Sequence, residues 1–376
     1  MKSKQQLLVL IGTRPEAIKL APVVLALARS RFLAPHVCLT GQHATMAAEM
    51  LAHFGLKQDS ILVARRGGQG LTGLVGTVAS ELAHALARLQ PAGIIVQGDT
   101  TSAMLGAIAG FYERIPVFHI EAGLRSFDME QPFPEEFNRR VISLAASLHF
   151  CPTGVSRANL LAEGVPGKSL MVAGNTCIDA LMLTLSKSRE KRRIFSAGKR
   201  GILVTGHRRE NWDLGLESMC RALAKIAAGH DDVEIVYAVH PNPLVKRVAS
   251  EILSKTPNVR LVDPLGYADF CGAMRDATLI ISDSGGVQEE ALALGTPVLV
   301  TRNVTERPEV LKWKTVRLVG TEEATICREA NRLLNDPRHL REASRPHFPF
   351  GKGDASLRIA KRIEGFYQPA GRTSRK

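Results

Sequence analysis

Short, continuously apolar segments recur along this chain, and longer segments with apolar residues at helical spacing separate them. In the first half the apolar segments are Leu7–Ile11, His36–Leu39, Ile94–Gln97, Val117–Ile120 and Leu148–Cys151. In the second half they are Ile202–Thr205, Val233–Val239, Asn258–Val262, Thr278–Ser282, Pro297–Val300 and Thr315–Val319. Continuous rather than alternating apolar character is typical of parallel strands that are buried on both faces of a sheet.

The segments between these strands include Pro15–Arg29, Leu71–Leu89 and Leu216–Ala228, all with helical spacing. Two successive series of strand and helix predict two doubly wound α/β domains, and 376 residues exceed what one core usually supports. The charged stretch before residue 201 lacks strand character, so we expect a first domain over 1–173 and a second over 174–355. Their strand ends are expected to face each other across a cleft.

Composition excludes several classes of protein. Hydrophobic residues at 45% and charged residues at 23% describe an ordinary globular chain. No apolar run reaches the roughly 20 residues of a membrane span, and the run near the N-terminus is too short for a signal peptide. The six cysteines occur singly, without a CxxC pair, so neither disulfides nor a metal site is expected. Reduced thiols of this kind are typical of a cytoplasmic protein.

The chain has 49 basic and 36 acidic residues, a net charge of +13. Part of the excess lies in residues 187–200 and in the last six residues. Nucleic-acid binding would need aromatic residues among the basic ones, yet aromatics make up only 5% of the chain. A solvated linker and a charged terminus are the simpler interpretation, and some of the charge could serve an anionic small substrate.

Carboxylates follow two of the predicted strands. Asp99 comes just after Ile94–Gln97, and Glu121 comes directly after Val117–Ile120. The pair Glu135-Glu136 follows a short distance along the chain. Ligands of parallel sheets bind beyond the carboxyl ends of the strands, and crowded carboxylates raise one another's pKa. The pattern therefore predicts an enzyme that moves protons.

A second candidate site opens the helix after the strand Thr278–Ser282. Ser284, Gly285 and Gly286 would leave free backbone N–H groups at the positive end of the helix dipole, where an anion can bind. Glu290 lies about one turn further along, where it could bind a ribose. The alternative is a glycine-rich turn with Ser284 as the N-cap. Neither a GxGxxG fingerprint nor a Walker lysine is present, so NAD and ATP are not supported.

Basic side chains and histidines also follow strand ends. Arg14 and Lys19 flank the first helix start, which favours a diphosphate. His207 follows the first strand of the second domain, and His240 and Arg307 follow two others. Each could instead be an ordinary surface or hydrogen-bonding residue. The chain has no GxSxG elbow and no metal-ligand spacing, so neither a nucleophilic serine nor a metal is expected.

In chain order, these motifs resemble those of the bacterial non-hydrolysing UDP-N-acetylglucosamine 2-epimerases. The matching segments are GTRPEAIKLAP at 12–22, TGQH at 40–43, GDTTSAM at 98–104, HIEAGLRS at 119–126, PFPEEFNR at 132–139, GNTCIDAL at 174–181, TGHRREN at 205–211, DSGGVQEEA at 283–291 and TERPE at 305–309. The resemblance covers nearly the whole chain. It implies two Rossmann-like domains of the GT-B glycosyltransferase type, with a C-terminal helix in 356–376 crossing back to the first domain.

The resemblance implies reversible C2 epimerisation of UDP-N-acetylglucosamine to UDP-N-acetylmannosamine, through elimination and re-addition of UDP and a 2-acetamidoglucal, without a cofactor. It implies that Asp99, Glu121 and Glu135 are the acid–base carboxylates. It places Arg14, Lys19 and His207 near the diphosphate and the leaving group. The residues implied to bind UDP are Arg14, Phe270 against the uracil, Ser284, Gly285, Gly286, Glu290 and Arg307. A cytoplasmic homodimer is also implied.

Two alternatives share this architecture. One is a hydrolysing epimerase that releases UDP and free N-acetylmannosamine, and the other is a UDP-sugar glycosyltransferase. The segment around Glu121 keeps the non-hydrolysing form, and a transferase would not explain the clustered carboxylates. Many members of the family bind UDP-N-acetylglucosamine as an allosteric activator, for which Gln42, His43 and His240 are the candidate residues. The chain continues with Ala44-Thr45-Met46 instead of long polar residues, and residues 127–131 also depart from the family pattern.

Overall fold

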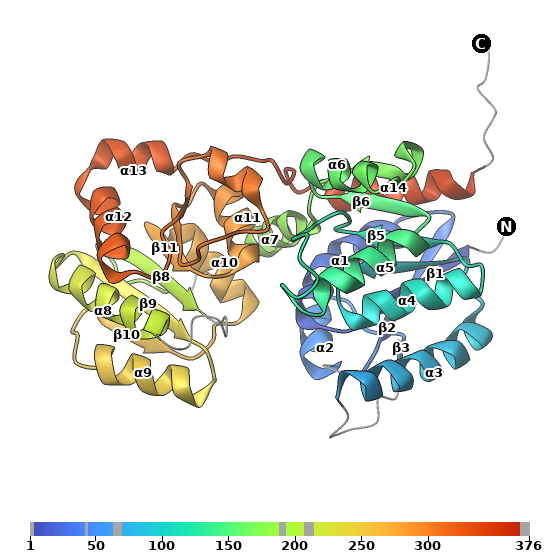
Figure 1. Cartoon of the computed structure of the whole chain (residues 1–376), viewed down its shortest axis with the longest axis horizontal. Helices are drawn as coiled ribbons and strands as arrows, with labels where there is room; N and C mark the ends of the chain where they lie inside the picture. Colours follow the sequence, from blue (N-terminus) through green and yellow to red (C-terminus); the bar gives the residue numbers. More distant parts are fainter. Residues whose placement is uncertain (1–3, 42–43, 63–69, 188–192, 207–213, 369–376) are drawn as a thin grey trace, which may run out of the picture. The chain divides into compact units, whose positions relative to one another are not determined.

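The computed structural model describes residues 4–41, 44–62, 70–187, 193–206 and 214–368, and the chain forms two compact units (Figure 1). Unit 1 comprises Met1–Ala180 and Phe350–Lys376, and unit 2 comprises Leu181–Pro349. Each unit is built on one parallel sheet flanked by helices. This architecture confirms the predicted fold class of two doubly wound α/β domains.

The sheet of unit 1 has seven parallel strands in the order β3-β2-β1-β4-β5-β6-β7. In chain order the strands are β1 Gln5–Ile11, β2 Leu33–Leu39, β3 Ser60–Ile61, β4 Gly93–Gln97, β5 Val117–Ile120, β6 Leu148–Cys151 and β7 Leu170–Val172. The apolar pattern predicts all of these except β3 and β7. The two residues of β3 carry too little pattern to distinguish a strand from a loop, and the prediction also omits the short apolar β7.

Both faces of this sheet are buried, as the continuous apolar pattern requires. In β1, Leu7, Val9 and Ile11 belong to a core cluster that includes helices α1 and α14, whereas Leu8 and Leu10 belong to a second cluster that includes α3 and α4. Successive side chains of a strand point to opposite faces, so one apolar run serves both clusters. The helices of unit 1 are α1 Arg14–Ala28, α2 Ala44–His53, α3 Leu71–Leu89, α4 Thr101–Tyr112, α5 Glu135–Ala145, α6 Gly154–Ala162, the start of α7 Thr176–Lys187, and α14 Ala355–Tyr367.

Helix α14 belongs to unit 1, although it comes after the whole of unit 2 in the sequence (Figure 1). Ile359 and Ile363 pack into the same cluster as α1, each contributing about 2 kcal/mol of burial free energy. The buried Asp179 carboxylate accepts hydrogen bonds from the backbone amides of Ala355 and Ser356, at 3.2 and 2.7 Å. This side chain satisfies amide groups that the first turn of a helix leaves unpaired.

The sheet of unit 2 has six parallel strands in the order β10-β9-β8-β11-β12-β13. They are β8 Arg200–Gly206, β9 Val233–Val239, β10 Val259–Val262, β11 Leu279–Ser282, β12 Val298–Val300 and β13 Val316–Leu318. The apolar pattern predicts all six. The helices are α8 Leu214–Ala228, α9 Pro243–Leu253, α10 Tyr267–Asp276, α11 Gly285–Leu294, α12 Glu323–Asn335 and α13 Pro337–Ala343, with a 3-10 turn η3 at Pro308–Lys312.

Each sheet reverses its winding direction once, between β1 and β4 in unit 1 and between β8 and β11 in unit 2. Loops that leave neighbouring strands in opposite directions open a crevice at the carboxyl ends, where ligands of this fold bind. The loops before α1 and α4, and the loop before α11, lie at these points. None of the helices within the described ranges is long and apolar enough to cross a membrane.

Candidate active site

Glu121 is the most heavily hydrogen-bonded carboxylate at the strand ends of unit 1. It directly follows β5, and its two oxygens lie 2.7 and 2.6 Å from Lys19 Nζ on α1. The amide group of Asn175 donates a bond of 2.8 Å to Oε1, and that of Gln97, at the end of β4, donates to Oε2. The carboxylate is 4% exposed. Donors from three separate elements therefore stabilise a buried anion that would otherwise be costly.

The backbone of Glu121 is held in a strained conformation. Its φ is +63°, in the left-handed region that side chains with a Cβ rarely adopt. Such a conformation costs on the order of 1–3 kcal/mol and persists where surrounding contacts enforce it. The bonds from Lys19, Gln97 and Asn175 are contacts of that kind. Strain of this type is concentrated at functional sites.

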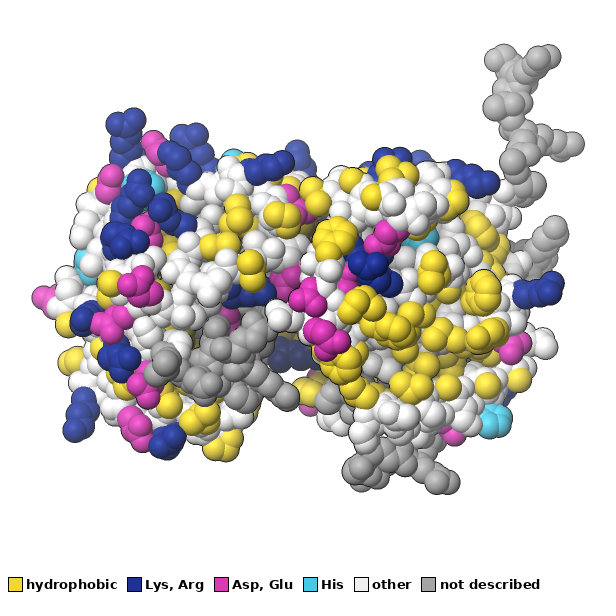
Figure 2. Space-filling view, viewed as in Figure 1, with side chains coloured by type: hydrophobic (Ala, Val, Ile, Leu, Met, Phe, Trp, Pro, Cys, Tyr) yellow, Lys and Arg dark blue, Asp and Glu magenta, His cyan; other side chains and the backbone are white. Residues whose placement is uncertain are grey.

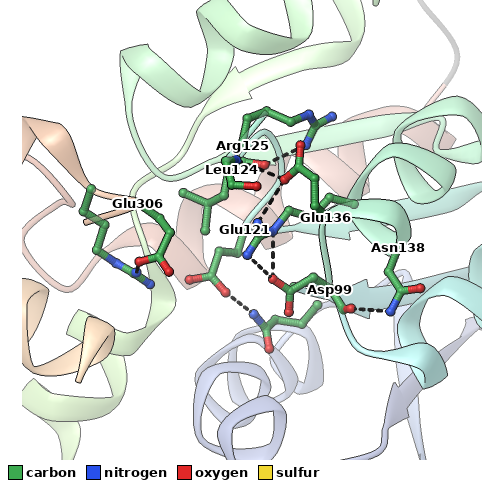
Figure 3. A network of polar contacts seen from close by, with 12 residues as sticks. Asp99, Glu121, Leu124, Arg125, Glu136, Asn138 and Glu306 are labelled. Atoms are coloured by element: carbon green, nitrogen blue, oxygen red, sulfur yellow. Dashed lines mark hydrogen bonds and ion pairs between the residues drawn. The ribbon is translucent and has the colours of Figure 1, made fainter. Parts of the chain in front are cut away.

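Asp99 follows β4, the neighbouring strand, and is fixed by helix α5. The Arg139 guanidinium lies 2.9 Å (Nε) and 2.7 Å (NH2) from Asp99 Oδ2. The side-chain amide of Asn138 donates a bond of 2.8 Å to the backbone oxygen of Asp99. The Asp99 side chain stays 26% exposed, so a ligand can reach it. Figure 3 shows Asp99 and Glu121 projecting into the same region.

The two adjacent glutamates at the start of α5 have different environments. Glu136 is fully buried and accepts bonds from the Ser126 amide at 3.0 Å and from Arg139 at 3.1 Å (Figure 3). Burial alone would raise the pKa of Glu136, but these donors together hold it below its usual range. Glu135, the first residue of α5, is only partly buried. The structure thus distinguishes Glu136, which is fully buried, from Glu135, which is partly exposed as a residue although its Oε2 is buried.

A buried histidine of the sheet supports the turn that contains Asp99. His119 Nε2, in β5, lies 2.8 Å from the backbone oxygen of Gly98. The ring of His149, its register partner in β6, lies 6.4 Å away, centroid to centroid. Burial lowers the pKa of His119 to about 3, with His149 as a further cause, and burial lowers the pKa of His149 to about 4. Both rings are therefore neutral at physiological pH.

A further carboxyl lies at the end of β1. Glu16 Oε2 accepts bonds from the Gly12 amide at 3.1 Å and the Thr13 hydroxyl at 2.8 Å, and Oε1 accepts from the Thr100 hydroxyl at 2.8 Å. Burial raises the pKa of Glu16 to about 7 despite these donors. This group therefore changes charge near neutral pH.

In unit 2 the turn after β11 presents the start of α11. Ser284 occupies the N-cap position, but its side chain makes no capping bond. A Cβ at Gly285 would lie 2.6 Å from NH1 of Arg307, so the Arg307 side chain lies directly against this turn. The Arg307 guanidinium also pairs with the buried Glu289. The helix N-terminus, with this guanidinium beside it, is suited to a phosphate.

The remaining predicted residues of unit 2 lie near this turn or at another strand end. Glu290 is a buried residue of α11, and the half-buried Phe270 lies on α10, which packs on α11. His240 follows β9, and its Nδ1 accepts a bond of 3.2 Å from the Asn242 amide. In unit 1, Arg14 is the half-buried first residue of α1.

Three predicted residues, Gln42, His43 and His207, lie outside the described residues.

Several side chains of the site are absent from the candidates that the sequence provides. They are Glu16, Gln97, His119, Arg139 and Asn175. For two of them a signal exists in the pattern: Gln97 and His119 are polar residues inside otherwise apolar strands, and their side chains need buried partners. Glu16, Arg139 and Asn175 carry no such signal.

The arrangement has clear chemical capacities. Asp99 and Glu121, at adjacent strand ends, can exchange protons with a ligand or stabilise positive charge on it. Lys19 supplies a cation beside them. In unit 2, the α11 N-terminus with Arg307 can bind an anion. Taken separately, the carboxylates of unit 1 suit a ligand with an exchangeable proton, and the α11 turn of unit 2 suits an anionic group.

Comparisons with known proteins point to one family. The family model for UDP-N-acetylglucosamine 2-epimerase matches residues 25–364. The UDP-N-acetylglucosamine 2-epimerase of Escherichia coli strain K12 is 45% identical over 369 residues, covering 96% of this chain and 98% of the relative.

Two solved structures are similar as well. The UDP-GlcNAc 2-epimerase from Neisseria meningitidis, bound to UDP-GlcNAc, has a TM-score of 0.91 and 38% identity, covering 96% of this chain and 100% of that one. The Methanocaldococcus jannaschii enzyme, in complex with UDP-GlcNAc and UDP, has a TM-score of 0.81 and 31% identity, covering 96% and 99%.

The histidine pair predicts a pH dependence of stability. Folding lowers the pKa of His149 from 6.5 to about 4, so below pH 6.5 the unfolded chain binds a proton that the folded chain does not. The stabilisation is complete above pH 6.5 and is lost as the pH falls towards 4. We expect His149→Phe to make the free energy of unfolding fall less steeply over this range, as measured by urea titration. His84→Gln, at an exposed position on α3, is the control; an unchanged slope in His149→Phe would contradict the prediction.

Proposed function

The chain belongs to the UDP-N-acetylglucosamine 2-epimerase family, and from this premise we propose that it interconverts UDP-N-acetylglucosamine and UDP-N-acetylmannosamine at C2 without net hydrolysis. The observation that carries the proposal is the pairing of Lys19 with Glu121 at the strand end next to that of Asp99. Epimerisation of this substrate needs carboxylates for a carbon-bound proton and cations for a departing diphosphate, and this site offers both.

The proposed reaction starts with elimination. A carboxylate takes the proton from C2 while the bond between C1 and the diphosphate oxygen breaks, which gives UDP and a 2-acetamidoglucal. UDP then adds back to C1 while C2 receives a proton on the opposite face. No oxidant or reductant is consumed, because the first step removes a proton and UDP and the second step adds a proton and UDP back. Retaining UDP until re-addition is what distinguishes this reaction from hydrolysis.

We assign different roles to the three carboxylates. Glu121, whose carboxylate accepts bonds from Lys19, Gln97 and Asn175, stabilises the positive charge that develops at C1. Asp99, which is partly exposed, and Glu135, which begins α5, transfer the protons. Lys19, Arg14 and His207 act at the diphosphate.

UDP binding is assigned to residues of unit 2. The amides of Gly285 and Gly286, with the Ser284 hydroxyl and Arg307, bind the diphosphate at the start of α11. Glu290 accepts hydrogen bonds from the ribose, and Phe270 lies against the uracil. The positive end of α11 then stabilises the negative charge that UDP gains when it leaves.

Incubation of the purified protein with UDP-N-acetylglucosamine in D2O tests the proposal. We expect both UDP-linked epimers to gain deuterium at C2 by NMR, with UDP still attached at equilibrium, because the C2 proton exchanges with solvent before re-addition. Formation of free N-acetylmannosamine would instead indicate a hydrolysing epimerase. If neither deuterium exchange nor a product is detected, both functions are contradicted.

Asp99→Asn separates chemistry from binding. The amide cannot accept the C2 proton, so we expect the exchange rate to fall by about a hundredfold or more, with UDP affinity by calorimetry almost unchanged. Asp231→Asn, at an exposed position in unit 2, is the control. Loss of UDP binding in Asp99→Asn would show that Asp99 has a structural role instead.

We further propose that the protein is a homodimer through an apolar surface on α4 and α5. Figure 2 shows hydrophobic side chains gathered over these helices. The members include Phe111 at 62%, Tyr112 at 77%, Phe137 at 48% and Leu144 at 86% exposure. Contiguous apolar patches of this kind are typical of protein interfaces, and a second copy with two-fold symmetry would cover the same surface on both subunits.

Leu144→Glu tests this surface, since a charge there would have to be buried without a partner. We expect sedimentation velocity to report a dimer for the unmodified protein and a monomer for this variant. Leu161→Glu, at an exposed position on α6, should remain dimeric. A dimer that survives Leu144→Glu would exclude this surface as the interface.

A further inference from the structure

The first two turns of helix α1 carry three charged residues, Arg14, Glu16 and Lys19, and the mechanism proposed above gives no role to Glu16. Lys19 binds Glu121, whereas Glu16 lies three residues earlier in the helix. Residues three apart lie on the same side of a helix. One turn of α1 therefore directs a cation and a carboxyl to neighbouring parts of the site.

The Glu16 carboxyl joins two turns that are far apart in sequence. Through Oε2 it binds the Gly12 amide and the Thr13 hydroxyl, in the turn after β1, and through Oε1 it binds the Thr100 hydroxyl, in the turn after β4. The side chain is 2% exposed. The two turns also pack closely, because a Cβ on Gly12 would lie 2.4 Å from Ser102 Oγ.

Thr100 connects this carboxyl to the catalytic turn. It is the N-cap of α4, and its hydroxyl accepts a bond of 3.0 Å from the Ala103 amide while donating to Glu16. Asp99 is the preceding residue. The turn of residues 98–100 is thus held at Gly98 by His119, at Asp99 by Asn138 and Arg139, and at Thr100 by Glu16. The last of these contacts fixes the turn relative to α1.

The environment of Glu16 distinguishes it from an ordinary capping residue. Burial is the largest cause that raises its pKa, and the bonds from the two threonines and the backbone only partly offset it. The charged groups on the surrounding elements are Arg14 and Lys19 on α1, Asp99 before α4 and Glu121 after β5, whereas the largest causes of the pKa shift are burial and the bonds from Thr13, Thr100 and Gly12. An ionisable carboxyl in a dry, fully bonded position is costly, and such positions are concentrated at functional sites.

We propose that Glu16 is a positioning residue for Asp99: through the Thr100 hydroxyl it holds the turn after β4 so that the Asp99 carboxylate reaches the C2 proton. The inference rests on the proposed role of Asp99. The ionised carboxylate can accept all three bonds, whereas the protonated form loses an acceptor site. Asp99 should accordingly be best placed when Glu16 is ionised.

The test compares Glu16→Ala and Glu16→Gln with two changes on the other side of the contact, Thr100→Val and Thr100→Ser. Epimerisation kcat and KM, UDP affinity and melting temperature are measured for each, with Glu251→Gln, exposed on α9, as the control. We expect Glu16→Ala and Thr100→Val to lower kcat by roughly tenfold or more, since misplaced groups can lose up to about a hundredfold. KM and UDP affinity should change by no more than about twofold. Thr100→Ser, which keeps the hydroxyl, should restore kcat.

Two further readouts separate positioning from a general structural role. The double variant Glu16→Ala/Thr100→Val should be no slower than the slower single variant, because both changes remove one contact. The unmodified enzyme should lose kcat as the pH falls below about 7, and Glu16→Gln should lack this inflection because the amide does not ionise. If Glu16→Ala does not fold, Thr100→Val tests the same contact and Glu16→Gln tests the pH dependence.

Three results would overturn the inference: an unchanged kcat in Glu16→Ala and Thr100→Val, multiplicative losses in the double variant, or an unchanged pH profile in Glu16→Gln. Failure of the underlying function is distinguishable from these results. An unmodified protein that neither epimerises nor exchanges C2 would refute the proposed function, whereas an active enzyme that is impaired by Asp99→Asn but indifferent to Glu16 and Thr100 would refute only the positioning role.

Discussion

The ion pair between the partly buried Lys19 and the buried Glu121 is the interaction on which the site of unit 1 depends. It joins the first helix to the end of β5, and it accompanies a left-handed backbone at Glu121 that would be unfavourable without compensating contacts. Removing either partner would leave a buried charge with fewer donors or acceptors. The same ion pair therefore fixes the end of β5 relative to α1 and stabilises the charge of the Glu121 carboxylate.

The same logic extends to the other carboxylates. Arg139 and Asn138 on α5 hold Asp99, and Glu136 anchors Arg139 in turn. In unit 2 the guanidinium of Arg307 lies directly against the α11 turn, with NH1 2.6 Å from where a Cβ at position 285 would stand. In each case a side chain from one element fixes a functional group on another. Preorganisation of this kind lets a site stabilise charge without rearranging during the reaction.

The sequence pattern predicts the framework well, because a strand that is buried on both faces needs a continuous apolar run, as in β1, β4 and β11. It also predicts that Asp99 and Glu121 lie at strand ends. It does not predict their partners: Glu16 and Thr100 are 84 residues apart and Lys19 and Glu121 are 102 apart, and local periodicity carries no information over such separations. Nor does it separate Glu135 from Glu136, because only the packing of α5 decides which of the two is buried.

The account requires that the bond between C1 and the diphosphate oxygen breaks and re-forms at this site. Positional isotope exchange tests that requirement most directly. UDP-N-acetylglucosamine labelled with ¹⁸O in the bridge between C1 and phosphorus should return with the label distributed between bridging and non-bridging oxygens of the β-phosphate, because UDP becomes free of the sugar before it adds back. Complete retention of ¹⁸O in the bridge, in molecules that have exchanged or inverted C2, would show that this bond stays intact and would contradict the account.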